Sequence, residues 1–275
     1  MGNFLTISRL DLQSSFHSKW FWGYTLCLLI GIGSIFASGI SDSRVSGFTG
    51  LTRLLLIFIQ ACNLILPIFI LVSTVRTLVK EKENSIFEYL LSFPISLKEY
   101  FFAKFLSRFI ILSVPLLGSM CAAVLLCILK GQKVPYEVIF LYTGLLMVST
   151  FFYVSLSFLI SSIVKSQEAG LGLSLFIWLV FIALLDIALL GLMIKALLPE
   201  NLIYAIALCN PTQVFKIAAI SLFDPVLSVV GPVSFFILDT LGSIPFLVYA
   251  FCYFSILGTG MVFSAFYFFS RKDLL

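Results

Sequence analysis

The chain has 275 residues, of which 61% are hydrophobic and only 11% are charged, and its formal net charge is +4. Average soluble domains have about 45–50% apolar and about 25% charged residues, so this composition indicates an integral membrane protein. The small positive charge is dispersed and includes no run rich in Lys or Arg, which argues against nucleic acid binding.

Six stretches are long and apolar enough to cross a membrane, because a spanning helix needs about 20 mostly apolar residues. Only helices satisfy all their backbone groups in lipid without forming a closed barrel. We therefore predict an all-α integral membrane protein, with one transmembrane domain over 1–275. In chain order, the predicted transmembrane helices are 20–40, 54–75, 105–129, 136–164, 169–196 and 245–269.

The distribution of Lys and Arg predicts that both termini are cytoplasmic, since cytoplasmic loops carry an excess of these residues. With that orientation, eleven of the 17 Lys and Arg residues are inside. These are Arg9, Lys19, Arg76, Lys80, Lys82, Lys98, Lys104, Arg108, Lys165, Arg271 and Lys272. We expect a bacterial inner membrane protein.

The outer loop 197–244 is long, apolar and rich in Pro. Asn210, Pro211, Gln213 and Lys216 make spanning costly for 201–223. We predict short helices here that lie on the outer membrane surface or dock a partner.

Two helix starts stand out in the inner loop that joins the second and third predicted spans. Ser85 with Glu88, and Ser96 with Glu99, fit the S-x-x-E capping box, in which Ser and Glu side chains bond each other's backbone N–H groups. Pro94 separates the two starts and disfavours helix at the preceding residue. The pattern predicts a short helix over 86–92 and a second helix that begins near 97 and continues into the membrane.

The short predicted helix has an apolar side formed by Ile86, Phe87, Leu90 and Leu91. Glu81, Glu83 and Glu88 place negative charge near its start, where the helix dipole favours it. Such a helix can lie on lipid or fit a groove on a soluble partner. A plain amphipathic connector is the alternative.

The segment 79–107, VKEKENSIFEYLLSFPISLKEYFFAKFLS, resembles the inner loop of type-2 ABC transporter permeases. Matching positions are Glu81, Glu83, Glu88, Leu90, Leu91, Ser92, Pro94, Ser96 and Lys104. The resemblance implies a cytoplasmic coupling helix that docks on a separate ATPase subunit. It assigns ATPase coupling to Glu81, Glu83, Ser85, Ile86, Phe87, Glu88, Leu90, Leu91, Pro94, Ser96, Lys98, Glu99 and Lys104. The family often has Gly-Thr where this chain has Asn84-Ser85-Ile86.

Segments 179–193 and 208–223 resemble the branch of this family that serves the maturation of nitrous oxide reductase, a copper enzyme. That resemblance implies an outer, periplasmic partner. The residues expected to dock it are Asn210, Pro211, Thr212, Phe215 and Lys216.

No G-x-x-x-x-G-K-[ST] phosphate-binding loop occurs, so we expect ATP and Mg²⁺ to bind in a partner chain and this chain to be no enzyme. Copper would need soft or imidazole ligands. His17 is the one histidine, the cysteines form no C-x-x-C pair, and no metal site or bound cofactor is predicted.

Three polar residues interrupt the predicted spans. Asp186 lies deep in the fifth, where a charge costs about 2.5–3.5 kcal/mol on insertion scales. It either lines a substrate pathway or gate, or holds helices together as a hydrogen-bonded carboxyl. Gln60 and Asn63 in the second span either line the same pathway or bridge helices.

The sequence thus predicts the permease subunit of an ATP-driven transporter that works as a dimer, with a membrane lipid environment and no nucleic acid. It would support copper-site maturation by exporting a small species or by transmitting force to a periplasmic protein. The alternatives are an exporter for a lipid, peptide or drug, of the gliding or immunity type, and a membrane scaffold without a motor.

Overall fold

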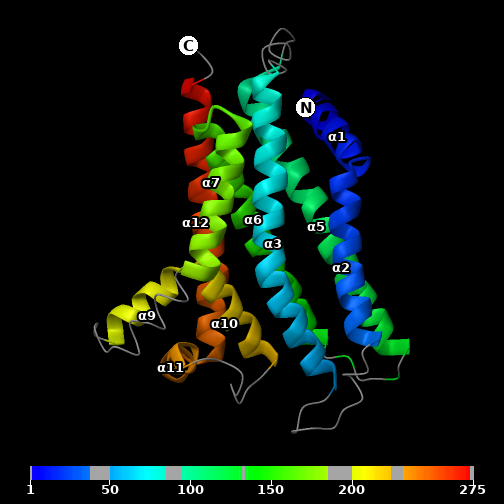
Figure 1. Cartoon of the computed structure of the whole chain (residues 1–275), viewed down its shortest axis with the longest axis vertical. Coiled ribbons are helices and arrows are strands. Elements are labelled where there is room, and N and C mark those ends of the chain that lie inside the picture. The colour runs from blue at the N-terminus through cyan, green and yellow to red at the C-terminus, as the bar shows by residue number, and fades with distance from the viewer. Residues whose placement is uncertain are drawn as a thin grey trace.

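The computed structural model describes residues 2–37, 50–84, 95–129, 131, 134, 136–184, 200–223 and 232–272. Every regular element in these ranges is helical (Figure 1). The helices are α1 (Gly2–Phe16), α2 (Lys19–Ala37), α3 (Gly50–Glu83), α5 (Leu97–Leu129), α6 (Tyr136–Ile163), α7 (Gln167–Leu179), the π-helical turn η3 (Val180–Leu184), α9 (Glu200–Cys209), α10 (Pro211–Phe223), α11 (Pro232–Leu241) and α12 (Ser243–Lys272). The predicted all-α class is confirmed for the described chain.

The long helices lie side by side along one axis (Figure 1). Helix α1, the end of α3, the start of α5 and the last turns of α12 lie at one end, which we call the termini end. Helices α9, α10 and α11 lie at the opposite end. The segment predicted to couple to an ATPase therefore joins α3 to α5 at the termini end.

Four helices in the described ranges are long and apolar enough to cross a membrane: Ile59–Glu81, Leu97–Leu129, Tyr136–Ile163 and Ser243–Arg271. They correspond to predicted spans two, three, four and six, but the second and third extend several residues beyond their predicted cytoplasmic ends. Those extensions carry charged residues, such as Glu81 and Glu99, which a hydropathy pattern assigns to a loop. The first and fifth spans, at α2 and α7, stay predictions.

Helix α6 is the most buried of these four helices and packs most extensively against α12, with α3 on another side. Small residues allow the close approaches. A Cβ added at Gly258 of α12 would lie 2.6 Å from the Phe151 ring of α6, and one at Gly170 of α7 would lie 2.8 Å from Val75 of α3. Because interiors are close-packed, the absence of a side chain at Gly170 and Gly258 sets the spacing of these helix pairs.

The outer loop forms short helices, as predicted, but α10 does not lie on a surface. Its Val214, Ile217, Ala218 and Ile220 are fully buried, and α10 packs against α3, α6 and α12. The run of apolar residues from 217 to 220 is long enough to bury every side of the helix, so α10 is part of the core.

Candidate coupling site and its polar network

Helix α5 begins with the predicted capping box. The backbone N–H of Glu99 donates to Ser96 Oγ over 3.2 Å, and the N–H of Ser96 donates to the Glu99 carboxylate over 3.2 Å. The two bonds satisfy N–H groups that have no partner inside the helix. The second helix start read from the sequence is therefore confirmed.

Glu83 links the end of α3 to the start of α7. Its carboxylate accepts a 2.8 Å hydrogen bond from the backbone N–H of Gln167, the first residue of α7. Ser166 caps the same helix by accepting from the N–H of Ala169 over 3.3 Å. An acidic side chain at this position also complements the positive end of the helix dipole. Glu83 thus ties α7 to the helix that precedes the coupling segment.

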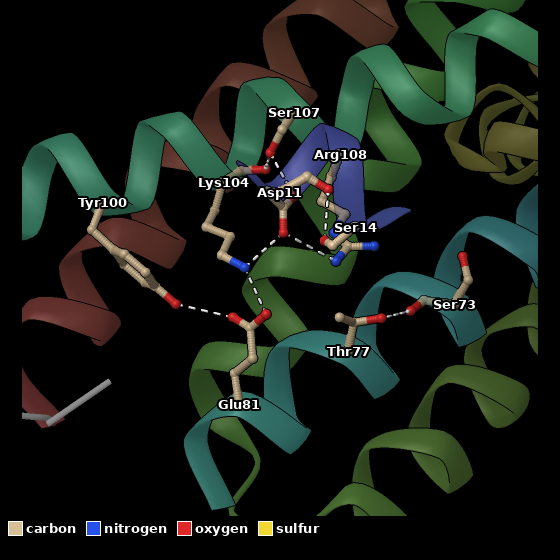
Figure 2. Close-up of polar contacts among 9 residues, drawn as sticks. All are labelled: Asp11, Ser14, Ser73, Thr77, Glu81, Tyr100, Lys104, Ser107 and Arg108. Carbon is tan, nitrogen blue, oxygen red and sulfur yellow. Dashed lines mark hydrogen bonds and ion pairs between the residues drawn. The ribbon is translucent and has the colours of Figure 1, made fainter. Parts of the chain in front are cut away.

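A network of charged and hydroxyl groups joins α1, α3 and α5 at the termini end (Figure 2). The ammonium of Lys104 lies 2.7 Å from Asp11 Oδ1 and 2.6 Å from Glu81 Oε1. Only 10% of the Lys104 side chain and 4% of the Asp11 side chain is exposed. Lys104 therefore bridges carboxylates from two other helices within the protein.

Hydroxyl groups complete the network (Figure 2). The Tyr100 hydroxyl donates to Glu81 Oε2 over 3.0 Å, and Ser107 Oγ donates to Asp11 Oδ2 over 2.6 Å. Arg108 Nη2 lies 3.4 Å from Asp11 Oδ1. Each oxygen of the two carboxylates has at least one donor, which is the condition under which buried charges are tolerated.

The ionisation of Asp11 reflects these contacts. Burial by itself raises the pKa of Asp11, but the charges of Arg108 and Lys104, with the hydrogen bonds from Lys104 and Ser107, outweigh it and lower the pKa below its ordinary value of 3.8. Asp11 is therefore a carboxylate at neutral pH and holds α1 against α5 as a charged group.

Asp11 is the acidic residue of the network that the sequence analysis did not single out. It is the one acidic residue of α1, and it lies on the same side of the helix as Ser8 and Ser15, which are also buried. Leu5 and Leu10 are exposed instead. A polar stripe at helical spacing in a short N-terminal helix, opposite exposed leucines, is the signal that indicates a polar partner inside the protein.

The predicted coupling residues fall into three groups. Ser85, Ile86, Phe87, Glu88, Leu90, Leu91 and Pro94 lie outside the described residues. Glu83, Ser96 and Lys98 are exposed at the ends of α3 and α5, with half-buried Glu99 beside them. Glu83 bonds the start of α7, and Ser96 and Glu99 bond each other. Lys104 pairs with Glu81 and with Asp11 of α1, so these contacts hold together the helices that flank the segment. ATPase coupling stays a prediction for the whole set.

Two of the three predicted pathway residues lie within the described residues. Asp186 lies outside the described residues. Gln60 is exposed and Asn63 is half-buried on α3, and their role in a pathway stays a prediction. On the next turn of the same helix, the backbone carbonyl of Leu64 accepts a 3.1 Å hydrogen bond from the Trp178 indole N–H, which holds α7 against α3.

At the opposite end, the Asn210-Pro211-Thr212 sequence holds the start of α10 against η3. The Asn210 side-chain amide and the Thr212 hydroxyl both donate to the carbonyl of Phe181, over 3.0 Å and 2.8 Å. A π-helical turn leaves carbonyls without their usual partners, and these two side chains supply partners. Asn210 Oδ1 also accepts from the Thr212 N–H over 3.1 Å, as an N-cap does.

Four of the five residues predicted to dock an outer partner are therefore buried: Asn210, Pro211, Thr212 and Phe215. Their side chains face the interior because α10 packs into the bundle. Lys216 is half-buried. An outer partner would meet Lys216 and other exposed side chains before it met the buried four, and docking stays a prediction.

The described ranges contain no group of three or more His, Cys, Asp or Glu side chains that could hold a metal ion. His17 Nδ1 lies 2.8 Å from the carbonyl of Gln13, one turn earlier in α1.

The helical architecture, with polar contacts at both ends of the predicted coupling segment 81–99, is compatible with a membrane permease, and the family comparison shows which family it is. The model of the ABC-2 family transporter proteins matches residues 5–274, so this chain belongs to that family. The resemblance to type-2 ABC permeases is confirmed.

Two curated relatives are similar to this chain over most of its length. The chain is 23% identical over 241 residues to "Probable ABC transporter permease protein NosY" of Stutzerimonas stutzeri, with 85% of this chain and 87% of the relative covered. It is 24% identical over 226 residues to the protein of the same description from Pseudomonas aeruginosa, with 80% and 82% covered. The chain is therefore an ABC-2 type permease similar to NosY.

Proposed function

We propose that this chain is the membrane subunit of an ATP-driven transporter in which a separate ATPase chain binds ATP and Mg²⁺. The observation that supports it best is the Lys104 bridge to Asp11 and Glu81. It ties α1, α3 and α5 together at the two helix ends that flank the predicted coupling segment. A displacement of that segment would therefore move three helices as one unit.

The wider contacts extend this unit. Glu83 bonds the start of α7, so motion at the end of α3 also reaches the fifth predicted span. In the proposed mechanism, the 86–92 helix sits in a groove of the ATPase, and closure of the ATPase tilts the helices of the unit. Lys98 and Glu83 would make ionic contacts with the ATPase surface, because both are exposed beside the segment.

The proposed assembly contains two copies of the permease, two ATPase chains and a periplasmic partner in a bacterial inner membrane. In the proposed topology of six membrane spans, both termini are cytoplasmic and the termini end would face the ATPase. By similarity to NosY, the particular role is maturation of the copper sites of nitrous oxide reductase. A small species would be exported, or force would be transmitted to the periplasmic partner.

Photo-crosslinking tests the coupling role. A photo-reactive amino acid at Lys98, which is exposed at the start of α5, should capture a nucleotide-hydrolysing protein in intact cells. The matched control is Leu129, 73% exposed at the other end of the same helix, which should not capture it. Capture at neither position, or equally at both, would contradict the proposal.

A second variant tests the apolar side of the 86–92 helix. Leu90→Asp with Leu91→Asp should abolish co-purification of the ATPase, because charged side chains cannot enter an apolar groove. Resistance to alkaline extraction should stay unchanged, which shows that the chain still inserts into the membrane. Undiminished co-purification would argue for the motor-free scaffold.

The export and force-transmission roles differ in what stimulates ATP turnover. An exporter of a lipid, peptide or drug should respond to added solute, whereas a force transmitter should respond to its periplasmic protein. In the native host, loss of this chain should leave nitrous oxide reductase with incomplete copper sites. A normal copper content would reject that particular role.

A further inference from the structure

A cavity of about 270 Å³ lies beside the polar network, between α1, α2, α3 and α5. Cavities for drug-sized ligands hold about 300–1,000 Å³, so this one is large enough for a small headgroup. Its wall is divided into two kinds of surface. One part is aromatic and aliphatic, with Trp20, Tyr24 and Phe69, and the other carries three cations: Arg76, Lys80 and Arg108.

The cavity has positive charge that the network does not neutralise. Lys104 and Arg108 are offset by the carboxylates of Asp11 and Glu81. Arg76 and Lys80 form no ion pair with any carboxylate of the described ranges, and both are exposed to the cavity side of α3. The Arg76 guanidinium instead lies 5.7 Å from the centre of the Trp20 ring. The local field therefore favours an anion.

Three buried polar atoms of the lining residues are unpartnered within the described chain: Ser15 Oγ, Tyr24 Oη and Arg108 Nε. Ser15 is 6% exposed and Tyr24 is 1% exposed. All three groups can donate a hydrogen bond. A buried donor without an acceptor costs stability, so a ligand with several acceptor oxygens would satisfy them.

The apolar part of the cavity wall can accommodate an acyl chain. Tyr24 stacks on Phe69 with ring centroids 4.1 Å apart, and Trp20 lies against Phe69 at 6.2 Å. Ile111 and Leu112 of α5 face the same cavity. Trp20 is 52% exposed at the start of α2, and Trp side chains prefer the headgroup level of a membrane. The cationic part of the wall thus lies next to the apolar part, at the level that Trp20 indicates for the lipid headgroups.

We infer that this cavity binds one anionic phospholipid. Its phosphate lies between Arg76, Lys80 and Arg108 and accepts a hydrogen bond from Ser15. Its acyl chains pass along the aromatic wall of Trp20 and Phe69. Arginine suits this role because its planar fork matches phosphate oxygens. The lipid fills the space between α1 and the three long helices and stabilises the packing of α1.

Native mass spectrometry of the full-length protein in mild detergent tests this inference. Phosphatidylglycerol, added at increasing concentration, should bind with one tight site, and phosphatidylcholine should not. Arg76→Gln with Lys80→Gln should weaken the tight site by roughly ten- to thirtyfold, since each basic residue near a membrane surface contributes about 1 kcal/mol to anionic lipid binding. Both residues are exposed, so the variant should fold.

The matched control removes the same charge at the same end of the molecule. Lys165 and Arg271 are exposed there but do not line the cavity, so Lys165→Gln with Arg271→Gln should retain the tight site. A second variant, Ser15→Ala, removes one unpartnered donor of the lining and should weaken binding severalfold. Equal binding by both double variants, or equal loss, overturns the inference.

A soluble phosphate ester has the same headgroup chemistry, and competition separates the two sources. Glycerol phosphate at a hundredfold excess over phosphatidylglycerol should displace little lipid if the aromatic wall contributes to binding. Full displacement would reassign the cavity to a soluble phosphate. The measurement needs no ATPase, so its result is independent of the coupling role proposed above.

Discussion

The two ends of the helix bundle hold their short helices in different ways. At the termini end, α1 is held by full charges, with Lys104 between Asp11 and Glu81. At the opposite end, the start of α10 and the end of α9 are held by neutral groups: Asn210 and Thr212 donate to the Phe181 carbonyl, and Tyr253 donates to the Cys209 carbonyl over 2.6 Å. Both sets of contacts join helices that are distant in the sequence.

The difference follows from what each set of contacts loses when one of its members is removed. Removing one member of a buried ion pair leaves an uncompensated charge, whereas removing a neutral donor leaves a carbonyl that retains other partners. The charged end therefore behaves as a single unit that is intact or broken. The neutral end loses its bonds one at a time. A charged network that is intact or broken as a whole suits the end where we propose that an ATPase acts.

The largest effect should come from Lys104→Met. Both Asp11 and Glu81 would lose their shared cation while still buried, and the free energy of unfolding should fall by about 3–5 kcal/mol. Thermal unfolding in detergent measures it. The control is Lys98→Met on the same helix, where an exposed side chain should change stability by no more than about 0.5 kcal/mol. Adding Asp11→Asn to Lys104→Met should recover part of the loss, and no recovery would mean that the network is not a unit.

A smaller effect is expected from Asn210→Ala at the neutral end. The variant loses the cap of α10 and one of the two bonds to Phe181, which together stabilise the fold by about 1–3 kcal/mol. Ser221→Ala is the control on α10, because Ser221 Oγ bonds only the Ala218 carbonyl of its own helix. If Asn210→Ala costs as much as Lys104→Met, the contrast between the two ends does not hold.

The smallest effect should appear as a pH dependence that only the charged end shows. Because the pKa of Asp11 is lowered in the folded protein, its charged form contributes stability above about pH 3.8, and that contribution is lost as the pH falls through the lowered pKa. The thermal midpoints of wild type and Asp11→Asn should therefore differ near neutral pH and draw together as the pH falls below the ordinary aspartate pKa of 3.8. Parallel curves would show that Asp11 is not the titrating group, and Asn210→Ala should stay parallel to wild type throughout.

Much of the fold could be predicted because its signals are local. The apolar runs specify the long helices, and the start of α5 follows from Ser96 and Glu99, three residues apart. Charged residues beside an apolar run lead to an incorrect helix boundary for the same reason, because the local pattern does not show their partners in other helices. Glu81 was assigned to a loop, yet it lies inside α3 and is paired there with Lys104 of α5.

The contacts that make the candidate sites could not be read in this way. Lys104 and Asp11 are 93 residues apart, and Asn210 is 29 residues from Phe181. Such pairs depend on which faces of two helices meet and at which height, and a periodicity in one segment does not specify either. The cavity beside the network is a further case, since its lining comes from four helices.

By itself, the sequence determined that the chain enters a membrane, that its elements are helices, and where one helix is capped, because hydrophobicity and hydrogen-bond satisfaction act within short windows. The tertiary structure alone decided that α10 is part of the core, that buried Lys104 bridges Asp11 and Glu81, and that Asp11 holds α1 against α5. Packing is the physical reason: a side chain becomes buried, paired or exposed according to the neighbours that arrive from other parts of the chain.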